Sequence, residues 1–212
     1  MDLWSRVDHP EVAEIRSARD GSLIKELVRQ DISALIEEGY SMPIRFSAPG
    51  RDGKNMIHGF LIKPTQFNPD RIYPVIENIY AGPHGFHVSK NFGLQISQRR
   101  LAELGFIIAK IDGMGTNWRS KKFHDHCWKN LADAGFPDRI AWLKAAAEKY
   151  SWLDLSRVGI YGGSAGGQNA LSALLHHGKF YKAAVSDCGC HDNRMDKIWW
   201  NEAWMGKMGP HY

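Results

Sequence analysis

Residues 157–176 read RVGIYGGSAGGQNALSALLH, and this stretch decides which fold the chain can adopt. At its centre Gly162, Ser164 and Gly166 form a G-x-S-x-G motif, preceded by an apolar run and followed by a helix-like segment. Glycines on both sides let the backbone turn sharply from strand to helix and leave the serine hydroxyl exposed above a sheet. The following helix would direct its first amides and its positive dipole end toward a developing oxyanion. The stretch predicts a nucleophilic serine for acyl transfer, the alternative being a glycine-rich turn that only opens a helix.

The segments around this motif alternate between strand-like and helix-like patterns. Residues 43–48 and 56–63 indicate a β-hairpin around a turn at 50–53. Alternating units predict a largely parallel sheet with helices on its faces. A hairpin leading into such a sheet, with the serine after a central strand, fits the α/β-hydrolase order. The predicted units are strands at 73–80, 106–111, 157–161 and 182–186 and helices at 92–104, 137–150 and 166–176.

The region before the hairpin is predicted to be helical. Residues 22–38 carry leucine, isoleucine and valine at near-helical spacing, which predicts a helix or a pair of short helical turns. Gly39 would end this helix.

Composition limits the classes of function. With 43% hydrophobic residues among 212, the chain can build one sizeable core. The formal net charge is only +4 and the basic residues are scattered, which argues against a nucleic-acid partner. No apolar run approaches the ~20 residues that cross a bilayer, and the first residues show no export signal. We therefore predict a soluble protein with no nucleic-acid and no membrane partner.

The cysteines do not predict a disulfide scaffold. Cys127, Cys188 and Cys190 cannot all pair within one chain, and the last two are too close for an unstrained bridge. Ligand-type residues cluster at 124–127 and 188–192, but neither cluster has the spacing of a zinc site. We expect no metal and no cofactor.

Several separate segments resemble the prolyl oligopeptidase family of serine peptidases, in particular its dipeptidyl-peptidase branch. GRDGKNMIHGFLIKP at 50–64 and YPVIENIYAGPHG at 73–85 are similar to the first strands of the family's hydrolase domain. IDGMGTNWRSKKFH at 111–124 and the serine elbow resemble later parts of it. HPEVAEIRSARDGS at 9–22 resembles the end of the preceding β-propeller. The resemblance implies a propeller remnant at 1–21 and the N-terminal portion of an α/β-hydrolase catalytic domain at 22–212.

The resemblance also implies an oxyanion hole. In the family, a tyrosine of the YAGP segment donates its hydroxyl to the oxyanion, and Tyr80 stands at that position. The backbone amide of Ala165, which follows the nucleophile, would be the second donor. Two preorganised donors can contribute roughly 3 to 4 kcal/mol each. The alternative for Tyr80 is a tyrosine packed at the end of a strand.

Substrate-binding residues are implied less directly. Trp199, Trp200 and Trp204 lie where the family places the aromatic walls of its P1 pocket, although packing in a core or an interface explains them equally well. Asp112 begins a DGxG loop that we expect to support the site. Ala165 replaces the tyrosine that dipeptidyl peptidases often have there, which leaves the P1 preference open.

The acid and the base of a catalytic triad are not evident. Hydrolases of this fold supply them after the serine, in the order Ser, Asp, His. In the family both lie beyond the segment ending MGKMGPHY, and a further βαβ unit needs at least ~30 residues. We therefore expect a fragment of a longer enzyme, with the fold truncated after the strand that follows the nucleophile helix. The alternative is an internal substitute from Asp187, His176, His177, His191 or His211.

Two functions of different classes remain. The first is a serine peptidase that cleaves short peptides through a Ser164 acyl-enzyme in the intact parent, the present chain being inactive without its acid and base. The second is a noncatalytic partial hydrolase domain that binds a partner, or forms a homo-oligomer, through an unpaired sheet edge. An esterase is a further alternative. The sequence assigns no compartment, and a parent enzyme in the cytoplasm or the periplasm fits equally.

Overall fold

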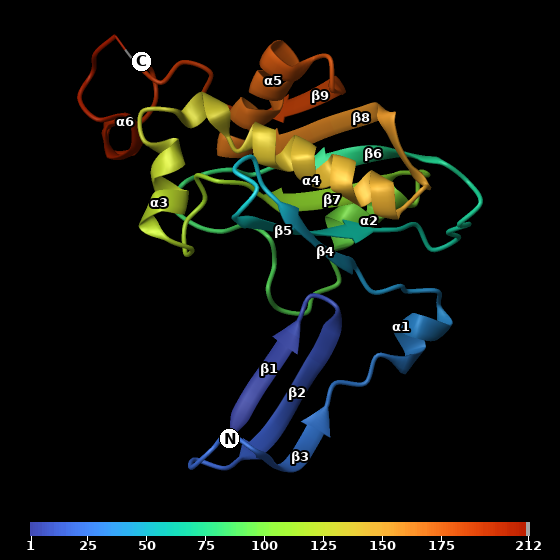
Figure 1. Ribbon diagram of the computed structural model, residues 1–212. Helices are drawn as coiled ribbons and strands as arrows, with labels where there is room; N and C mark the ends of the chain where they lie inside the picture. The colour runs from blue at the N-terminus through green and yellow to red at the C-terminus, as the bar shows by residue number, and fades with distance from the viewer. Residues whose placement is uncertain (211–212) are drawn as a thin grey trace.

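Six strands form the central sheet of the computed structural model, which describes residues 1–210. They are β4 (Ile44–Pro49), β5 (Met56–Ile62), β6 (Tyr73–Asn78), β7 (Ile107–Asp112), β8 (Leu153–Gly163) and β9 (Tyr181–Asp187), in the order β4-β5-β7-β6-β8-β9. The pairs β4/β5 and β5/β7 are antiparallel, whereas β6 runs parallel to β7 and β8, and β8 runs parallel to β9. The hairpin leading into a parallel sheet, as predicted, forms the central layer in Figure 1.

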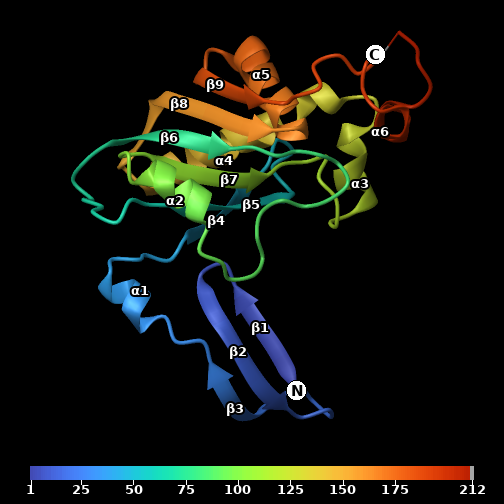
Figure 2. The same ribbon diagram turned by 180° about the vertical axis from the view of Figure 1, so that it is seen from behind.

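Helices cover both faces of this sheet. The helices are α1 (Ser33–Glu37), α2 (Ile96–Ala102), α3 (Lys121–His124), α4 (Phe136–Lys149), α5 (Ala165–His177) and α6 (Ile198–Met205), with 3-10 turns η1 (Asp125–Cys127) and η2 (Leu131–Asp133). α4 and α5 contribute Trp142 and Ala170 to the larger core, and α4 lies in front of the sheet in Figure 1. α2 contributes Ala102 to a smaller core on the opposite face, which Figure 2 shows. Neighbouring strand residues serve different cores, Leu61 the larger and Phe60 the smaller, because strand side chains alternate between faces.

A buried ion pair links three elements of the larger core. Arg139 of α4 donates from Nη1 to Glu77 Oε1 of β6 at 2.7 Å, and both side chains are wholly buried. Tyr181 of β9 donates its hydroxyl to the other oxygen, Glu77 Oε2, at 2.8 Å. Both carboxylate oxygens therefore have partners, as a buried charge requires.

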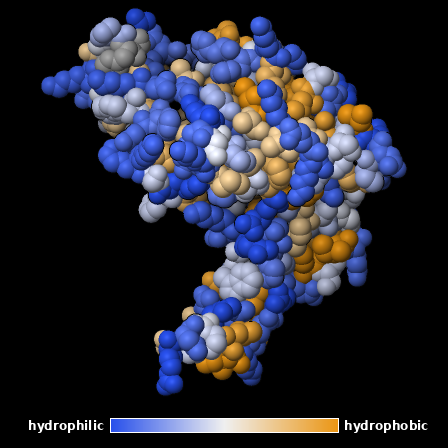
Figure 3. Space-filling model, viewed as in Figure 1, coloured by the Kyte–Doolittle hydropathy of each residue, from blue (hydrophilic) through white to orange (hydrophobic). Residues whose placement is uncertain are grey.

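The N-terminal residues form a second, three-stranded antiparallel sheet of β1 (Asp2–Arg6), β2 (His9–Arg16) and β3 (Leu23–Arg29). The helix predicted over residues 22–38 is wrong, because β3 pairs with β2 and only α1 is helical. Pairing with β2 gives this segment backbone partners that outweigh its near-helical spacing. Exposed leucine, isoleucine and valine side chains on β3 and α1 form orange patches in Figure 3.

The other predicted elements are confirmed with shifted ends. The helix predicted at 92–104 begins only at Ile96, because Gln95 adopts a left-handed backbone with φ 51°. The hairpin turn closes through a hydrogen bond from Gly53 N to Gly50 O of 2.9 Å. Helices α3 and α6 were not predicted.

Within residues 1–210, no helix has both the length and the apolar composition to cross a membrane.

Candidate active site

Ser164 stands between β8 and α5 in a strained backbone conformation. Its φ of 57° and ψ of −123° lie in a region that residues with a Cβ rarely adopt. Its N–H donates to the carbonyl of Asp187 at 2.9 Å, and its own carbonyl accepts from the amides of Gly167 and Gln168. The side chain is exposed. The strand-to-helix elbow that the motif predicted is present, with its serine presented at the surface.

The glycines of the motif permit this turn for a steric reason. A Cβ on Gly162 would lie 2.5 Å from the carbonyl oxygens of Ile79 and Gly166, so no larger residue fits without moving backbone. A Cβ on Gly166 would meet the same Ile79 oxygen. The elbow therefore packs backbone to backbone against the segment that follows β6.

The segment after β6 places Tyr80 beside the elbow. A Cβ on Gly166 would lie 3.4 Å from Cδ2 of the Tyr80 ring, which shows how closely the ring approaches the first turn of α5. The ring meets His84 edge-on at 5.8 Å between centroids and is tilted against His87 at 4.6 Å. A Cβ on Gly82 would lie 2.6 Å from Tyr80 Cε1, so this glycine is needed for the loop to fold over the ring.

Two buried side chains hold the Tyr80 loop in place. Asn169 of α5 accepts through Oδ1 from the amide of Ala81 at 3.0 Å, which ties the loop directly to the nucleophile helix. The carboxylate of Asp112 accepts from the amides of His87 and Val88 at 2.8 to 3.1 Å. The DGxG loop thus supports the site, as expected, whereas the contribution of Asn169 was not predicted.

The histidines of this region are held by carbonyl groups. His87 donates from Nε2 to the carbonyl of Gly82 at 2.8 Å, and burial lowers the pKa of its ring. His124 donates from Nε2 to the carbonyl of Pro83 at 2.8 Å and contacts the Trp204 ring edge-on. The first bond closes the loop on itself, and the second ties the loop to α3.

One cavity of about 450 Å³ brings all the predicted site residues together. Ser164, Tyr80 and Ala165 line it on one side. The amide of Ala165 belongs to the first residue of α5, where a helix provides no acceptor of its own. The other side is formed by α6, through Trp199, Trp200 and Trp204. This places the predicted nucleophile, both expected oxyanion donors and the three tryptophans around one space.

Aromatic contacts fix the tryptophan wall. Trp200 meets Trp199 and Trp204 edge-on, with centroids 6.0 and 5.9 Å apart. Trp200 also meets His84 edge-on at 5.4 Å, which joins α6 to the Tyr80 loop. Trp199 is 65% exposed, so it does not pack in the core, whereas packing in an interface stays an alternative for it.

The cavity has further lining residues that the sequence did not identify. Burial and the nearby charge of Asp196 raise the pKa of the Cys190 thiol. None of the further lining residues belongs to a catalytic pattern, although Cys188 and Cys190 come soon after β9, the strand that follows α5. The further lining residues are His84, Gln168, Cys188, Cys190, Asp196 and Lys197.

Among residues 1–210, Ser164 makes no hydrogen bond to a histidine. His176 and His177 lie at the far end of α5, about 18 Å from the serine at 1.5 Å per residue. His191 contacts Ser186 at 3.3 Å instead. Asp187 acts on the elbow through its backbone carbonyl. His211 lies outside the described residues.

Metal-binding geometry is absent from the described chain, since residues 1–210 contain no group of three or more His, Cys, Asp or Glu side chains able to hold an ion. In the two ligand-rich clusters, Cys127 is buried and Cys190 donates to the carbonyl of Asp192 at 3.2 Å.

Comparison with known proteins places this geometry in context. Residues 92–212 match the model of the prolyl oligopeptidase family. The chain is 32% identical to human dipeptidyl peptidase 8 over 149 residues, which cover 69% of the chain and 16% of that protein. It is 34% identical over 112 residues to a probable dipeptidyl-aminopeptidase B of Coccidioides posadasii, covering 53% of the chain and 12% of that protein.

Solved structures give the same result for the fold. A putative dipeptidyl aminopeptidase IV from Bacteroides ovatus superposes with a TM-score of 0.80 at 25% identity, over 97% of this chain and 29% of that one. Dipeptidyl peptidase 4 of Porphyromonas gingivalis superposes with a TM-score of 0.76 at 24% identity, over 96% and 29%. The predicted α/β-hydrolase fold is confirmed. The chain spans less than a third of the length of each of these relatives.

Proposed function

Because this chain belongs to the prolyl oligopeptidase family, we propose that it carries the nucleophile and the oxyanion hole of a serine peptidase acting on short peptides. The observation that carries the proposal is the single cavity that Ser164 shares with Tyr80, Ala165 and the tryptophans of α6. The strained elbow supports it, because such strain persists only where the surrounding structure holds it.

The proposed reaction begins with attack of Ser164 Oγ on the carbonyl carbon of a peptide bond. As the new C–O bond forms, the carbonyl electron pair moves onto oxygen, and the serine proton passes to a general base. The oxyanion accepts hydrogen bonds from the Tyr80 hydroxyl and the Ala165 amide. The base then protonates the leaving amine, and water hydrolyses the acyl-enzyme.

The tryptophan wall is the proposed contact for the substrate side chain next to the scissile bond. Trp199, Trp200 and Trp204 present aromatic surface to the same cavity as the nucleophile. Such surface suits an apolar or ring-shaped side chain.

We assign the general base and its orienting carboxylate to residues other than 1–210. The basis for this assignment is that Ser164 forms no hydrogen bond with a histidine among residues 1–210. The oxyanion hole and substrate binding alone can retain ~10³-fold acceleration over water, far below a full triad. On this proposal the 212-residue chain reacts slowly by itself, provided that His211 does not supply the base.

Fluorophosphonate labelling of the purified chain, read by intact mass, tests both parts. We expect slow labelling that imidazole accelerates, because imidazole can enter the cavity of about 450 Å³ and act as the missing base. Ser164→Ala should abolish the labelling, whereas Ser172→Ala, a change on the same helix, should leave it intact.

The outcomes separate the two parts of the proposal. Labelling that survives Ser164→Ala, or no labelling even with imidazole, would refute Ser164 as a nucleophile. Rapid stoichiometric labelling without imidazole would retain the nucleophile and refute the external base. If the chain is labelled rapidly and also turns over 4-nitrophenyl acetate but not a peptide anilide, the esterase alternative is favoured.

A second candidate function is self-association through β9. This strand forms one edge of the central sheet, and its Val185 is 67% exposed. Val185 lies on an apolar groove of about 260 Å³ shared with Leu101 and Tyr161. Exposed strand edges favour pairing with another chain. Val185→Lys should reduce any concentration-dependent dimer seen by light scattering. Leu175→Lys, at an exposed apolar site on α5, is the control. Equal effects of the two substitutions on the dimer would refute this interface.

A further inference from the structure

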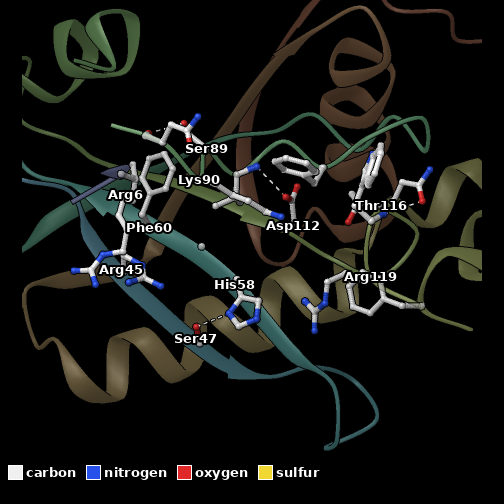
Figure 4. A pocket seen from close by; sticks show the side chains of 18 of the residues that line it. Arg6, Arg45, Ser47, His58, Phe60, Ser89, Lys90, Asp112, Thr116 and Arg119 are labelled. Atoms are coloured by element: carbon white, nitrogen blue, oxygen red, sulfur yellow. Dashed lines mark hydrogen bonds between the residues drawn. The ribbon is translucent and has the colours of Figure 1, made fainter. Parts of the chain in front are cut away.

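A second cavity, of about 440 Å³, lies between the small N-terminal sheet and the central sheet. It shares no lining residue with the Ser164 cavity. Its walls come from β1, β4 and β5, from the loop after Tyr80 and from the loop after β7, and Figure 4 shows it from close by. Nothing in the proposed peptidase chemistry uses it.

Basic side chains outnumber acidic ones around this cavity. Five lining residues are basic: Arg6, Arg45, His58, Lys90 and Arg119. In Figure 4, Arg45 and Arg119 lie on opposite sides with His58 between them. They come from separate elements, so the fold, and not a local basic run, brings them together.

The carboxylates near these cations neutralise only part of this charge. Asp112 is the lining carboxylate, and both of its oxygens already accept backbone amides of the Tyr80 loop. Asp8 pairs with Arg6 at 2.9 Å and reaches Arg45 only at 4.0 Å. The cavity therefore keeps an excess of positive charge.

Two of the cations are held by aromatic rings. The Arg119 guanidinium stacks over Phe123 at 4.7 Å and donates from Nη1 to the carbonyl of Met56. The Lys90 ammonium lies over the Phe86 ring at 4.2 Å. Among residues 1–210 neither forms an ion pair with a carboxylate. Both side chains are thus positioned, while their charge stays available to a ligand.

An apolar surface adjoins the cations. Phe86 and Trp118 line the cavity and are 38% and 72% exposed, and half-buried Val88 lines it too. A ligand with a ring or an apolar body could cover this surface while its charged end meets the cations.

We propose that this cavity binds an organic anion, whose sulfonate-, carboxylate- or phosphate-like group contacts Arg45, His58 and Arg119 while its apolar body covers Phe86 and Trp118. The volume suits a small molecule, since ligand sites commonly measure about 300–1,000 Å³. Charge-assisted hydrogen bonds supply the specificity for the anionic group.

The electrostatics of His58 support this assignment. The charges of Arg45, Arg119 and Asp112 act on its ring, and the Ser47 hydroxyl contacts its Nδ1 at 2.7 Å. Burial and then the charges of Arg119 and Arg45 lower the pKa of His58 against a smaller opposing effect of Asp112. A bound anion should therefore raise this pKa, because it favours the imidazolium form.

Calorimetric titration of the full chain with naphthalene-2-sulfonate tests the proposal. The sulfonate stays charged throughout the useful pH range, and naphthalene-2-sulfonamide is its neutral counterpart of the same shape. We expect the sulfonate to bind at least about tenfold more tightly than the sulfonamide, in line with charge-assisted contacts. Inorganic sulfate, which lacks the apolar body, should bind more weakly than the sulfonate.

Matched variants locate the binding. Arg45→Gln with Arg119→Gln should weaken sulfonate binding by about tenfold or more. Lys144→Gln with Lys179→Gln removes the same charge from exposed positions elsewhere and should change it little. The His58 ring signals of the wild-type chain should also shift on titration, which gives a readout that needs no variant. Equal binding of sulfonate and sulfonamide, equal losses in the two variant pairs, or unmoved His58 signals would overturn the proposal.

Discussion

Replacing Tyr181 by phenylalanine tests the buried network of the larger core. The hydroxyl donates at 2.8 Å to Glu77 Oε2, on a side chain with no exposed surface. A hydrogen bond to a charged group contributes about 1.5–3 kcal/mol, and phenylalanine keeps the ring and opens no large cavity. Tyr181→Phe should therefore lower the free energy of unfolding by about 2 kcal/mol. For a chain of this length that corresponds to a fall in Tm of about 4–8 °C.

Calorimetric or circular-dichroism melting measures this change, and a neighbouring tyrosine supplies the control. The Tyr161 hydroxyl is also buried but has no hydrogen-bond partner among residues 1–210. Burial raises the pKa of Tyr161, which agrees with a hydroxyl that gains nothing from its surroundings. Tyr161→Phe should leave Tm unchanged or raise it.

A third substitution in the same network should destabilise the chain more than Tyr181→Phe does. Arg139→Met removes the cation and leaves the buried carboxylate of Glu77 unpaired, which should cost about 3–5 kcal/mol. If Tyr181→Phe lowers Tm no more than Tyr161→Phe does, the network does not stabilise the core as the distances imply, and the reasoning is refuted.

Three further changes probe the site. Gly162→Ala should destabilise the chain by more than 1 kcal/mol and abolish Ser164 labelling, because the added Cβ meets two carbonyl oxygens. The control Gly93→Ala should be tolerated, with Tm reporting stability and intact mass reporting labelling. Iodoacetamide at pH 8 should alkylate exposed Cys188 well before Cys127, because burial raises the pKa of the Cys127 thiol to about 11 and keeps it protonated; peptide mapping showing the reverse order would contradict this. Asn169→Ala should lower the free energy of unfolding in urea by about 1 kcal/mol or more, since it removes the acceptor of the half-buried Ala81 amide, and a neutral result would show that the loop has another anchor.

The sequence predicted the part of the fold that local patterns encode. The strands of the central sheet and helices α2, α4 and α5 were identifiable because their periodicity agrees with their final burial. The elbow was identifiable because Gly162 and Gly166 have a steric reason to be glycine. β3 was missed because its partner strand decides its conformation, and all of its residues are exposed.

The candidate site was predictable only where it follows a motif. Ser164, Tyr80 and Ala165 could be placed from their segments, and the cavity unites them with the tryptophans of α6. His84 and Asn169 could not be identified as site residues, because their contacts join segments far apart in the chain. Their catalytic and binding roles stay predictions until the labelling experiments are done.

The strand order has a consequence for how the chain folds as it leaves the ribosome. β6 pairs with β7 on one side and with β8 on the other, and both of these strands are synthesised after it. The hydrogen bonds of β6 are therefore completed only after residue 163 is made. The hydrogen bonds of Glu77 are completed later still, because Tyr181 of β9 supplies its last donor. At ordinary rates of synthesis the half-built sheet persists for several seconds. During that interval its apolar strands are open to aggregation, so slower synthesis near the start of β8 would be expected to lower the yield of folded protein, whereas a chaperone that holds residues 44–112 would raise it.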